Sequence, residues 1–354
     1  MFLVTFHGGR GKGSVHQLYS YKDDGSGGAP YLTAATPSGK TGLRDVQFRP
    51  AGKKGNFYLV NSSKSCSQIF QIAPGATSLP EPYVGGVCGK ETSLCSVYHP
   101  FAVCFDEGME TCYISNQDTN VVVRVAGPLS QVPEPGQPLP VAPALLKLPN
   151  NPTFLPGTFV ASQQPYTPGL PGCPTPTAVT AAQGGLGASG SGATPSHSVR
   201  GLDLVESLGI LYVADETDNC IRTYKVADGE YLGAVKDPQS LVNSPTHVLA
   251  VGTKVYVGVS PSKGNKGALV LCYDAEADTL SAVVSNDAKQ GVDVKHPSGL
   301  TFDGAGNFYM ADLNGRAVYK FASDFTPAGS QPFISGLPDS PEFIFWLNDK
   351  WVGA

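Results

Sequence analysis

The sequence predicts an all-β fold: a single β-propeller domain of six four-stranded antiparallel blades spanning residues 1–354. Three observations predict this fold. The sequence repeats a unit of short strands, its composition favours turns, and its two ends together complete one repeat. Of the 354 residues, 42 are glycine, 30 are proline and 15% are charged, while 41% are hydrophobic. These values predict many turns, few long helices and a sizeable core. Closed all-β folds often reach this length as one domain.

The clearest repeat lies at 296–321. It holds three short segments at 296–303, 306–312 and 316–321, separated by Gly, Asp and Asn turns, as in a β-meander. Four further copies follow the same pattern, at 43–48, 56–60 and 68–72; at 99–106, 111–116 and 121–125; at 201–205, 210–215 and 220–226; and at 245–250, 254–258 and 268–273.

The two ends of the chain are predicted to share the sixth blade. Segment 340–346 resembles a first strand with few partners after it, whereas 2–6 and 15–21 resemble second and third strands with no first strand before them. Joining the ends closes the ring and leaves no unpaired edge within it. The alternative is a seventh blade hidden in 128–196.

Segment 128–196 is a long insertion rich in Pro, Gly, Ser and Thr, and it ends in the low-complexity run 184–192. We expect one outer strand near 144–148. Long loops are usually functional or mobile. The remainder is therefore expected either to overhang the face where propellers bind ligands or to form a solvated loop.

The innermost strands point every second side chain at the propeller axis. Alignment of the blades places six residues at one level near the mouth of the channel: Arg44, Phe101, Arg200, Thr246, Ser298 and Glu342. Charges in a narrow channel are costly unless they are paired or used on a ligand. Either Glu342 bridges Arg44 and Arg200, or the arginines form a clamp for an anionic group.

Histidines gather at equivalent positions of the repeats. Four of the six histidines fall at or just before an innermost strand: His99, His197, His247 and His296. His7 is expected in a turn on the same face. Such a set predicts either a divalent metal site, for zinc or calcium, or acid–base catalysis near neutral pH. The alternative is that His-Pro pairs pack between blades; no organic cofactor is predicted.

Eight cysteines contain no Cys-x-x-Cys metal signature. Cys104 and Cys112 are expected to face each other across a hairpin, and Cys88 and Cys95 to flank one loop, with the latter pair better suited to a disulfide. Low charge and cysteine content favour a secreted or lumenal location over a cytoplasmic one. Residues 1–6 read as a strand and lack the features of a signal peptide.

Charge and hydropathy exclude several classes of partner. The net charge is −5 with scattered Lys and Arg, so no basic stripe predicts nucleic-acid binding. No apolar run is long enough to span a membrane. We expect a monomer that binds a small molecule or a peptide.

The five complete repeats resemble NHL repeats, which carry a Pro-x-Gly-Val strand, a Gly-Asn-hydrophobic-Tyr-Val-Ala-Asp strand and an Asn-x-Arg-hydrophobic strand. The resemblance covers most of the chain and is strongest at 200–226 and 296–321. It implies a six-bladed propeller, and fold alone does not assign an activity.

Three enzyme groups of similar architecture differ from this chain at their functional positions. Where NHL-like peptidyl-hydroxyglycine lyases carry zinc-binding histidines, this sequence has Phe101, Arg200 and Ser298. Gluconolactonase-type propellers bind a metal through an Asn and a following Asp. Asp215 and Asp312 match the Asp, but Arg200 and Ser298 stand where the Asn would be. Strictosidine-synthase-like enzymes place a Glu on an inner strand; Glu342 is the only candidate in this sequence, and the motif around it does not match that of the family.

The favoured hypothesis is an enzyme, a lyase or hydrolase, acting on a small polar or anionic molecule at the channel mouth. The substrate-binding candidates are Arg44, Arg200, Thr246, Ser298 and Phe101. The proton-transfer candidates are Glu342 and one of His99, His247 and His296. The alternative is a non-catalytic NHL-type propeller that recognises a protein or peptide through its loops.

Overall fold

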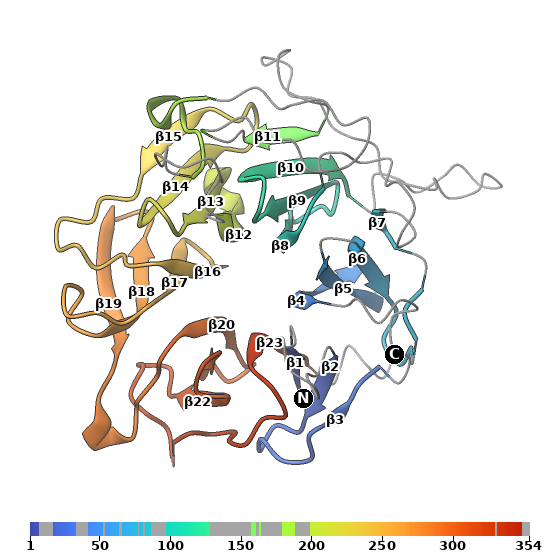
Figure 1. The fold of residues 1–354 in the computed structure, drawn as a ribbon, viewed down its shortest axis with the longest axis vertical. Helices are drawn as coiled ribbons and strands as arrows, with labels where there is room; N and C mark the ends of the chain where they lie inside the picture. The colour runs from blue at the N-terminus through green and yellow to red at the C-terminus, as the bar shows by residue number, and fades with distance from the viewer. Residues whose placement is uncertain are drawn as a thin grey trace.

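The structure is a computed structural model that describes residues 1–6, 17–32, 42–51, 54–63, 66–76, 78–80, 82–85, 97–127, 157–160, 163, 179–187, 199–329 and 331–348. In these residues the strands form six antiparallel sheets arranged in a ring (Figure 1). Each sheet is one blade. The predicted six-bladed, all-β propeller is confirmed, and the helices of the described residues are three short 3-10 turns.

Blades 1 to 3 follow the order of the chain. Blade 1 consists of β4 (Leu43–Ala51), β5 (Lys54–Ser63), β6 (Cys66–Ile72) and β7 (Val84–Gly85). Blade 2 consists of β8 (Pro100–Phe105), β9 (Thr111–Asn116), β10 (Val121–Ala126) and β11 (Thr158–Val160). Blade 3 consists of β12 (Val199–Val205), β13 (Ile210–Asp215), β14 (Cys220–Lys225) and β15 (Tyr231–Ala234).

The other blades complete the ring. Blade 4 consists of β16 (Pro245–Val251), β17 (Lys254–Val259), β18 (Ala268–Asp274) and β19 (Thr279–Ser285). Blade 5 consists of β20 (Pro297–Phe302), β21 (Phe308–Asp312) and β22 (Ala317–Phe321). The closing blade, blade 6, consists of β23 (Pro341–Trp346), β1 (Phe2–Phe6), β2 (Leu18–Tyr21) and β3 (Ala29–Pro30).

The two chain ends pair as predicted. Strand β23 lies antiparallel to β1, with Phe345 opposite Leu3 and Phe343 opposite Thr5. The Leu347 backbone N–H extends this pairing by donating to the Met1 carbonyl at 2.8 Å. The last strand of the chain therefore becomes the innermost strand of a blade whose other strands come from the beginning.

Two outer strands differ from the simple repeat. The outer strand of blade 2 is β11, at Thr158–Val160, rather than at 144–148, which lies outside the described residues. In blade 5 the place of a fourth strand is taken by two isolated bridges, Val318 to Ile334 and Phe321 to Pro327. Neither position has the alternating pattern that identifies a regular strand from sequence.

All six innermost strands begin with a register shift against the second strand of their blade. Such a bulge bends the strand and redirects its side chains. Glycine fits here because the next blade approaches closely: a Cβ on Gly201 would lie 2.7 Å from the Val248 nitrogen. The repeated bulge places equivalent residues on one face, called here the entry face because the innermost strands begin on it.

The core lies between neighbouring blades and across the axis. Between blades 3 and 4, a buried cluster joins Tyr212, Val257 and Leu271. A separate cluster of Phe101 and Phe343 joins blade 2 to the closing blade. Their rings are 5.7 Å apart, so apolar side chains fill the axis below the entry face.

Part of the long insertion packs against blades 2 and 3. Leu186 is fully buried in their shared cluster, and the Gly187 N–H donates to Asp215 Oδ2 at 3.0 Å. The Tyr224 hydroxyl donates to the Gly184 carbonyl at 2.7 Å. Most of 128–196 lies outside the described residues, and within those that are described no helix is long and apolar enough to cross a membrane.

The cysteine positions differ in register from the prediction. Cys104 lies opposite Tyr113 and Cys112 lies opposite Phe105, so the two cysteines do not face each other directly. Both are buried free thiols, and burial raises the pKa of each. Cys88 and Cys95 lie outside the described residues.

Candidate functional site

The entry face brings together both predicted arginines and Phe101. The Arg44 guanidinium carbon lies 4.7 Å from the centre of the Phe101 ring, and that of Arg200 lies 5.3 Å from it. The three residues come from blades 1, 2 and 3. Cations over an aromatic face are favourable, and this contact keeps two like charges near one another.

Arg44 is tied to the closing blade. Its Nη1 lies 3.4 Å from Glu342 Oε2, and its Nε donates to Ser62 Oγ at 2.9 Å. Each residue of the pair is only 8% exposed. Burial lowers the pKa of Arg44; the Glu342 carboxylate opposes that shift, and the charge of Arg200 adds to it. Glu342 therefore compensates a cation that is poorly solvated.

Arg200 pairs with a different carboxylate. Its Nε donates to Glu216 Oε2 at 2.7 Å, and its Nη2 also contacts that oxygen. The other oxygen, Oε1, accepts from Ser244 Oγ at 2.8 Å. The bridge from Glu342 to both arginines, one of the two alternatives considered from the sequence, is thus replaced by two separate ion pairs.

His99 is the predicted histidine with the most specific surroundings. Its Nδ1 lies 2.6 Å from Asp118 Oδ1, and both residues are buried. Its backbone adopts a φ of 52°, a left-handed conformation that few non-glycine residues occupy. Ser67 Oγ accepts from the His99 N–H at 2.8 Å, and the Gln117 N–H donates to the His99 carbonyl at 3.1 Å.

His247 lies in the packed interior rather than at the open face. It is 3% exposed, and its ring centre is 4.8 Å from that of Phe343. Burial lowers its pKa from 6.5 to about 4, although a hydrogen bond to the Ser298 backbone favours the charged form. The imidazole is therefore neutral near pH 7 and acts as part of the axial aromatic cluster.

His296 lies at the edge of the charged cluster. Its Nδ1 is 3.2 Å from Ser260 Oγ. Burial lowers its pKa; the carboxylates of Glu216 and Glu342 oppose that shift, and Arg200 adds to it. His296 thus lies within electrostatic reach of both ion pairs.

The two predicted hydroxyl residues have structural partners. Thr246 Oγ1 donates to the Pro297 carbonyl of the next blade at 2.7 Å. Ser298 Oγ donates to the Pro341 carbonyl at 2.8 Å, again across a blade boundary. These bonds connect successive innermost strands, so neither hydroxyl is directed at the charged cluster.

The comparisons with known proteins bear on the fold. No protein-family profile and no curated protein matches the chain. A chain in the crystal structure of a nidogen/laminin complex is similar over 97% of this chain and 96% of its own, at 10% identity with a TM-score of 0.54. A Bacteroides fragilis NCTC 9343 protein, provisionally described as a 6-phosphogluconolactonase, is similar over 98% of this chain and 97% of its own, at 13% identity with a TM-score of 0.51.

The shared feature is the propeller fold. At these identities the likeness carries no residue of either site to this chain. Any activity depends on the side chains at the entry face.

The described histidines do not fit a shared metal ion. Among the residues that the structure describes, no group of three or more His, Cys, Asp or Glu side chains could hold a metal. His99 has its Nδ1 on Asp118, and His247 packs against Phe343. His7 and His197 lie outside the described residues.

Four acidic residues with roles on the inner strands or the entry face were not selected from the sequence. Glu216 and Asp118 lie in turns that follow second strands, positions where Asp and Asn usually serve the turn itself. On innermost strands, the buried Asp45 accepts from the Val103 N–H of the next blade at 2.9 Å, and the half-buried Asp203 accepts from the Ala250 N–H of the next blade at 2.8 Å. For Asp45 and Asp203, the sequence signal was an acidic residue inside an otherwise apolar strand.

Proposed function

We propose that this chain is an enzyme of the lyase or hydrolase class that acts on a small anionic molecule at the entry face. The observation that carries the proposal is the 2.6 Å contact between His99 Nδ1 and Asp118. A carboxylate on Nδ1 holds the proton there and makes Nε2 the basic nitrogen, as in acid–base sites of hydrolases. His99 would take or give the proton of the reacting group.

The backbone of His99 fixes the position of its side chain. A left-handed conformation at a non-glycine residue costs about 1–3 kcal/mol and is retained where the surroundings enforce it. Ser67 and Gln117 hold both backbone groups of His99, and Asp118 holds its ring. Such an arrangement orients one imidazole at the expense of local stability.

The two arginines would bind the anionic group. Guanidinium presents paired donors that match the oxygens of carboxylate or phosphate. Arg200 is the more exchangeable partner, because its side chain is 16% exposed and that of Glu216 is 22% exposed. A ligand oxyanion would replace Glu216 on Arg200, while the buried Arg44–Glu342 pair maintains the field around it. Glu342 and His296 are the further proton-transfer candidates.

The test is turnover of a panel of lactones, carboxylate esters and phosphate monoesters by the purified chain. We expect at least one substrate class to react, with kcat reduced roughly 10²-fold or more by His99→Gln. Asp118→Asn should lower kcat and alter the pH profile, whereas Arg200→Lys should chiefly raise KM. Lys254→Ala, at the start of β17 on the opposite face, is the matched control. Full activity in His99→Gln would overturn the assignment.

A second candidate is a binding propeller that recognises an acidic protein segment. It is favoured by the resemblance of the repeats to NHL arrays, which commonly bind proteins, and by the similarity to a propeller solved in a nidogen/laminin complex. Saturable binding of an acidic peptide that Arg200→Ala abolishes, without turnover of any panel member, would favour this candidate over the enzyme.

A further inference from the structure

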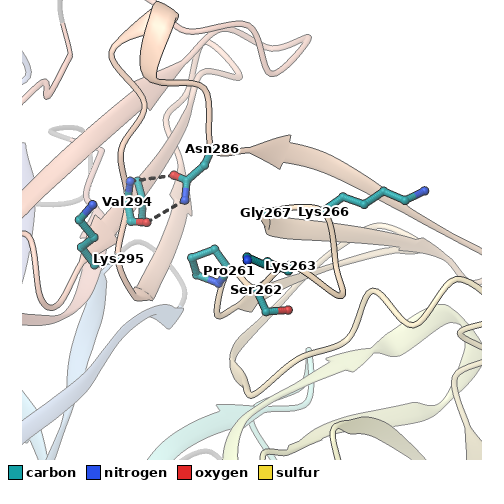
Figure 2. Close-up of a pocket in the computed structure, with 8 residues that line it drawn as sticks. All are labelled: Pro261, Ser262, Lys263, Lys266, Gly267, Asn286, Val294 and Lys295. Carbon is teal, nitrogen blue, oxygen red and sulfur yellow. Dashed lines mark hydrogen bonds between the residues drawn. The ribbon is translucent and has the colours of Figure 1, made fainter.

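A pocket of about 520 Å³ opens on the entry face between blades 4 and 5 (Figure 2). One wall is the loop between β17 and β18, and the other is the segment that leads into β20. The lining residues are Pro261, Ser262, Lys263, Lys266, Gly267, Asn286, Val294 and Lys295.

The lining of this pocket is basic. It contains three lysines and no acidic residue, in a chain whose net charge is −5. Lys295 pairs with Asp293, but among the described residues neither Lys263 nor Lys266 has an ion-pair partner. In Figure 2, Lys263 and Lys295 lie on opposite walls, and Lys266 extends outward along the rim. Positive charge on both walls of a pocket, unpaired on the wall that carries Lys263 and Lys266, attracts an anion.

Hydrogen bonds hold both walls in place. Asn265 is 1% exposed; its Nδ2 donates to the Ser260 carbonyl at 3.0 Å, and its Oδ1 accepts from the Ser262 N–H at 2.8 Å. On the other wall, Asn286 accepts from the Val294 N–H at 2.8 Å and donates to the Val294 carbonyl at 3.1 Å (Figure 2). The backbone that carries the lysines is therefore pre-organised, which lowers the entropic cost of binding.

The pocket is connected to the charged cluster on the entry face through His296. The Ser260–His296 contact of 3.2 Å joins the residue before Pro261 to the residue after Lys295. The charges of Glu216, Glu342 and Arg200 also act on the His296 ring. His296 is therefore linked both to the pocket segment and to the charged cluster.

We propose that this pocket is a second subsite that binds a dianionic oxyanion, the phosphate or sulfate group of a small molecule. Ammonium groups act as point charges toward such anions, and two or three of them favour a dianion over a monoanion. The proposal stands apart from catalysis at His99, because it concerns binding at a different place. A ligand with an anionic group at each end would span both regions past His296.

The test is calorimetric titration with inorganic phosphate and inorganic sulfate at low ionic strength, with acetate as the monoanion. We expect saturable binding of both dianions, and acetate binding weaker by about tenfold. Lys263→Ala/Lys266→Ala should weaken phosphate binding by about tenfold. The Gly267 amide should shift in the NMR spectrum on titration of the wild type.

Two controls distinguish phosphate binding in this pocket from phosphate binding elsewhere on the protein. Lys254→Ala removes one exposed lysine on the opposite face and should leave phosphate binding unchanged. In Arg200→Ala the Gly267 amide should still shift on phosphate titration, because Gly267 lies in the pocket; loss of that shift would place phosphate on the arginines and overturn the pocket subsite. Equal binding by the double lysine variant and the wild type, or equal affinity for acetate and phosphate, would overturn it as well.

Discussion

Arg44 of the first blade and Glu342 of the last strand form a buried ion pair, with Nη1 3.4 Å from Oε2. The two residues are separated by 298 positions in sequence. Their contact lies where β23 and β4 adjoin, so it couples the entry-face charge cluster to closure of the ring. Thr5 reinforces the same boundary, since its hydroxyl donates to the Arg44 carbonyl and accepts from the Phe343 N–H.

Removing one partner of this pair should destabilise the ring. Glu342→Gln leaves Arg44 buried without a countercharge, and such losses cost about 3–5 kcal/mol. The matched variant Glu216→Gln removes the partner of the more exposed Arg200 and should cost about 1 kcal/mol or less. Urea denaturation measures both. Equal losses would show that burial does not set the strength of the Arg44 pair.

The innermost strands could be predicted closely because their alternating pattern recurs in each blade, and so do the Gly, Asp and Asn turns that separate the strands. The same regularity placed Arg44, Arg200 and Glu342 at one level and paired the chain ends. Blade 5 lacks a regular fourth strand, and β11 follows a long insertion, so neither edge offered a periodic signal. Local pattern therefore determines the inner strands better than the outer ones.

The partners within the site were less accessible to sequence reasoning. Glu216 and Asp118 lie in turns, and a turn carboxylate looks alike whether it caps backbone or pairs with a side chain. His99 directly precedes β8, whereas His247 is the third residue of β16, and the bulge there directs its ring into the axial aromatic cluster. The direction of a side chain after a bulge depends on three-dimensional packing.

The edge of blade 5 should depend on one glutamine. Gln331 Oε1 accepts from the Lys320 N–H at 3.2 Å, and Nε2 donates to the Lys320 carbonyl, so the amide takes the place of a neighbouring strand. Gln331→Ala should lower the free energy of unfolding by about 1 kcal/mol and accelerate hydrogen exchange at the Lys320 amide. Gln331→Glu keeps an acceptor and should have an intermediate effect on that exchange. Unchanged exchange in Gln331→Ala would contradict this role.

Asp45 should make the protein less stable as pH rises. Burial raises its pKa from 3.8 to about 7, against the opposing hydrogen bonds from Val103 and Gln47. Between these values the unfolded chain releases a proton that the folded state retains, so stability present below pH 4 is lost as pH approaches 7. Asp45→Asn should remove this dependence of stability on pH, on the order of 4 kcal/mol, while keeping an acceptor for Val103. Asp324→Asn, at an exposed turn, is the control and should leave the slope between pH 5 and 8 unchanged.

His247 should act in the opposite direction over an overlapping pH range. Its pKa falls from 6.5 in the unfolded chain to about 4 in the folded state. The contribution of the neutral imidazole to folding stability is therefore complete above pH 6.5 and is lost as pH decreases toward 4. His247→Leu should therefore reduce acid destabilisation while retaining contact with Phe343. Because Asp45 and His247 oppose each other between pH 4 and 6.5, the wild-type stability should vary little there, whereas each single variant exposes the slope of the other. Denaturation of the wild type and both variants at pH 4.5, 5.5 and 6.5 measures this. Parallel profiles would show that neither buried group titrates with the expected shift.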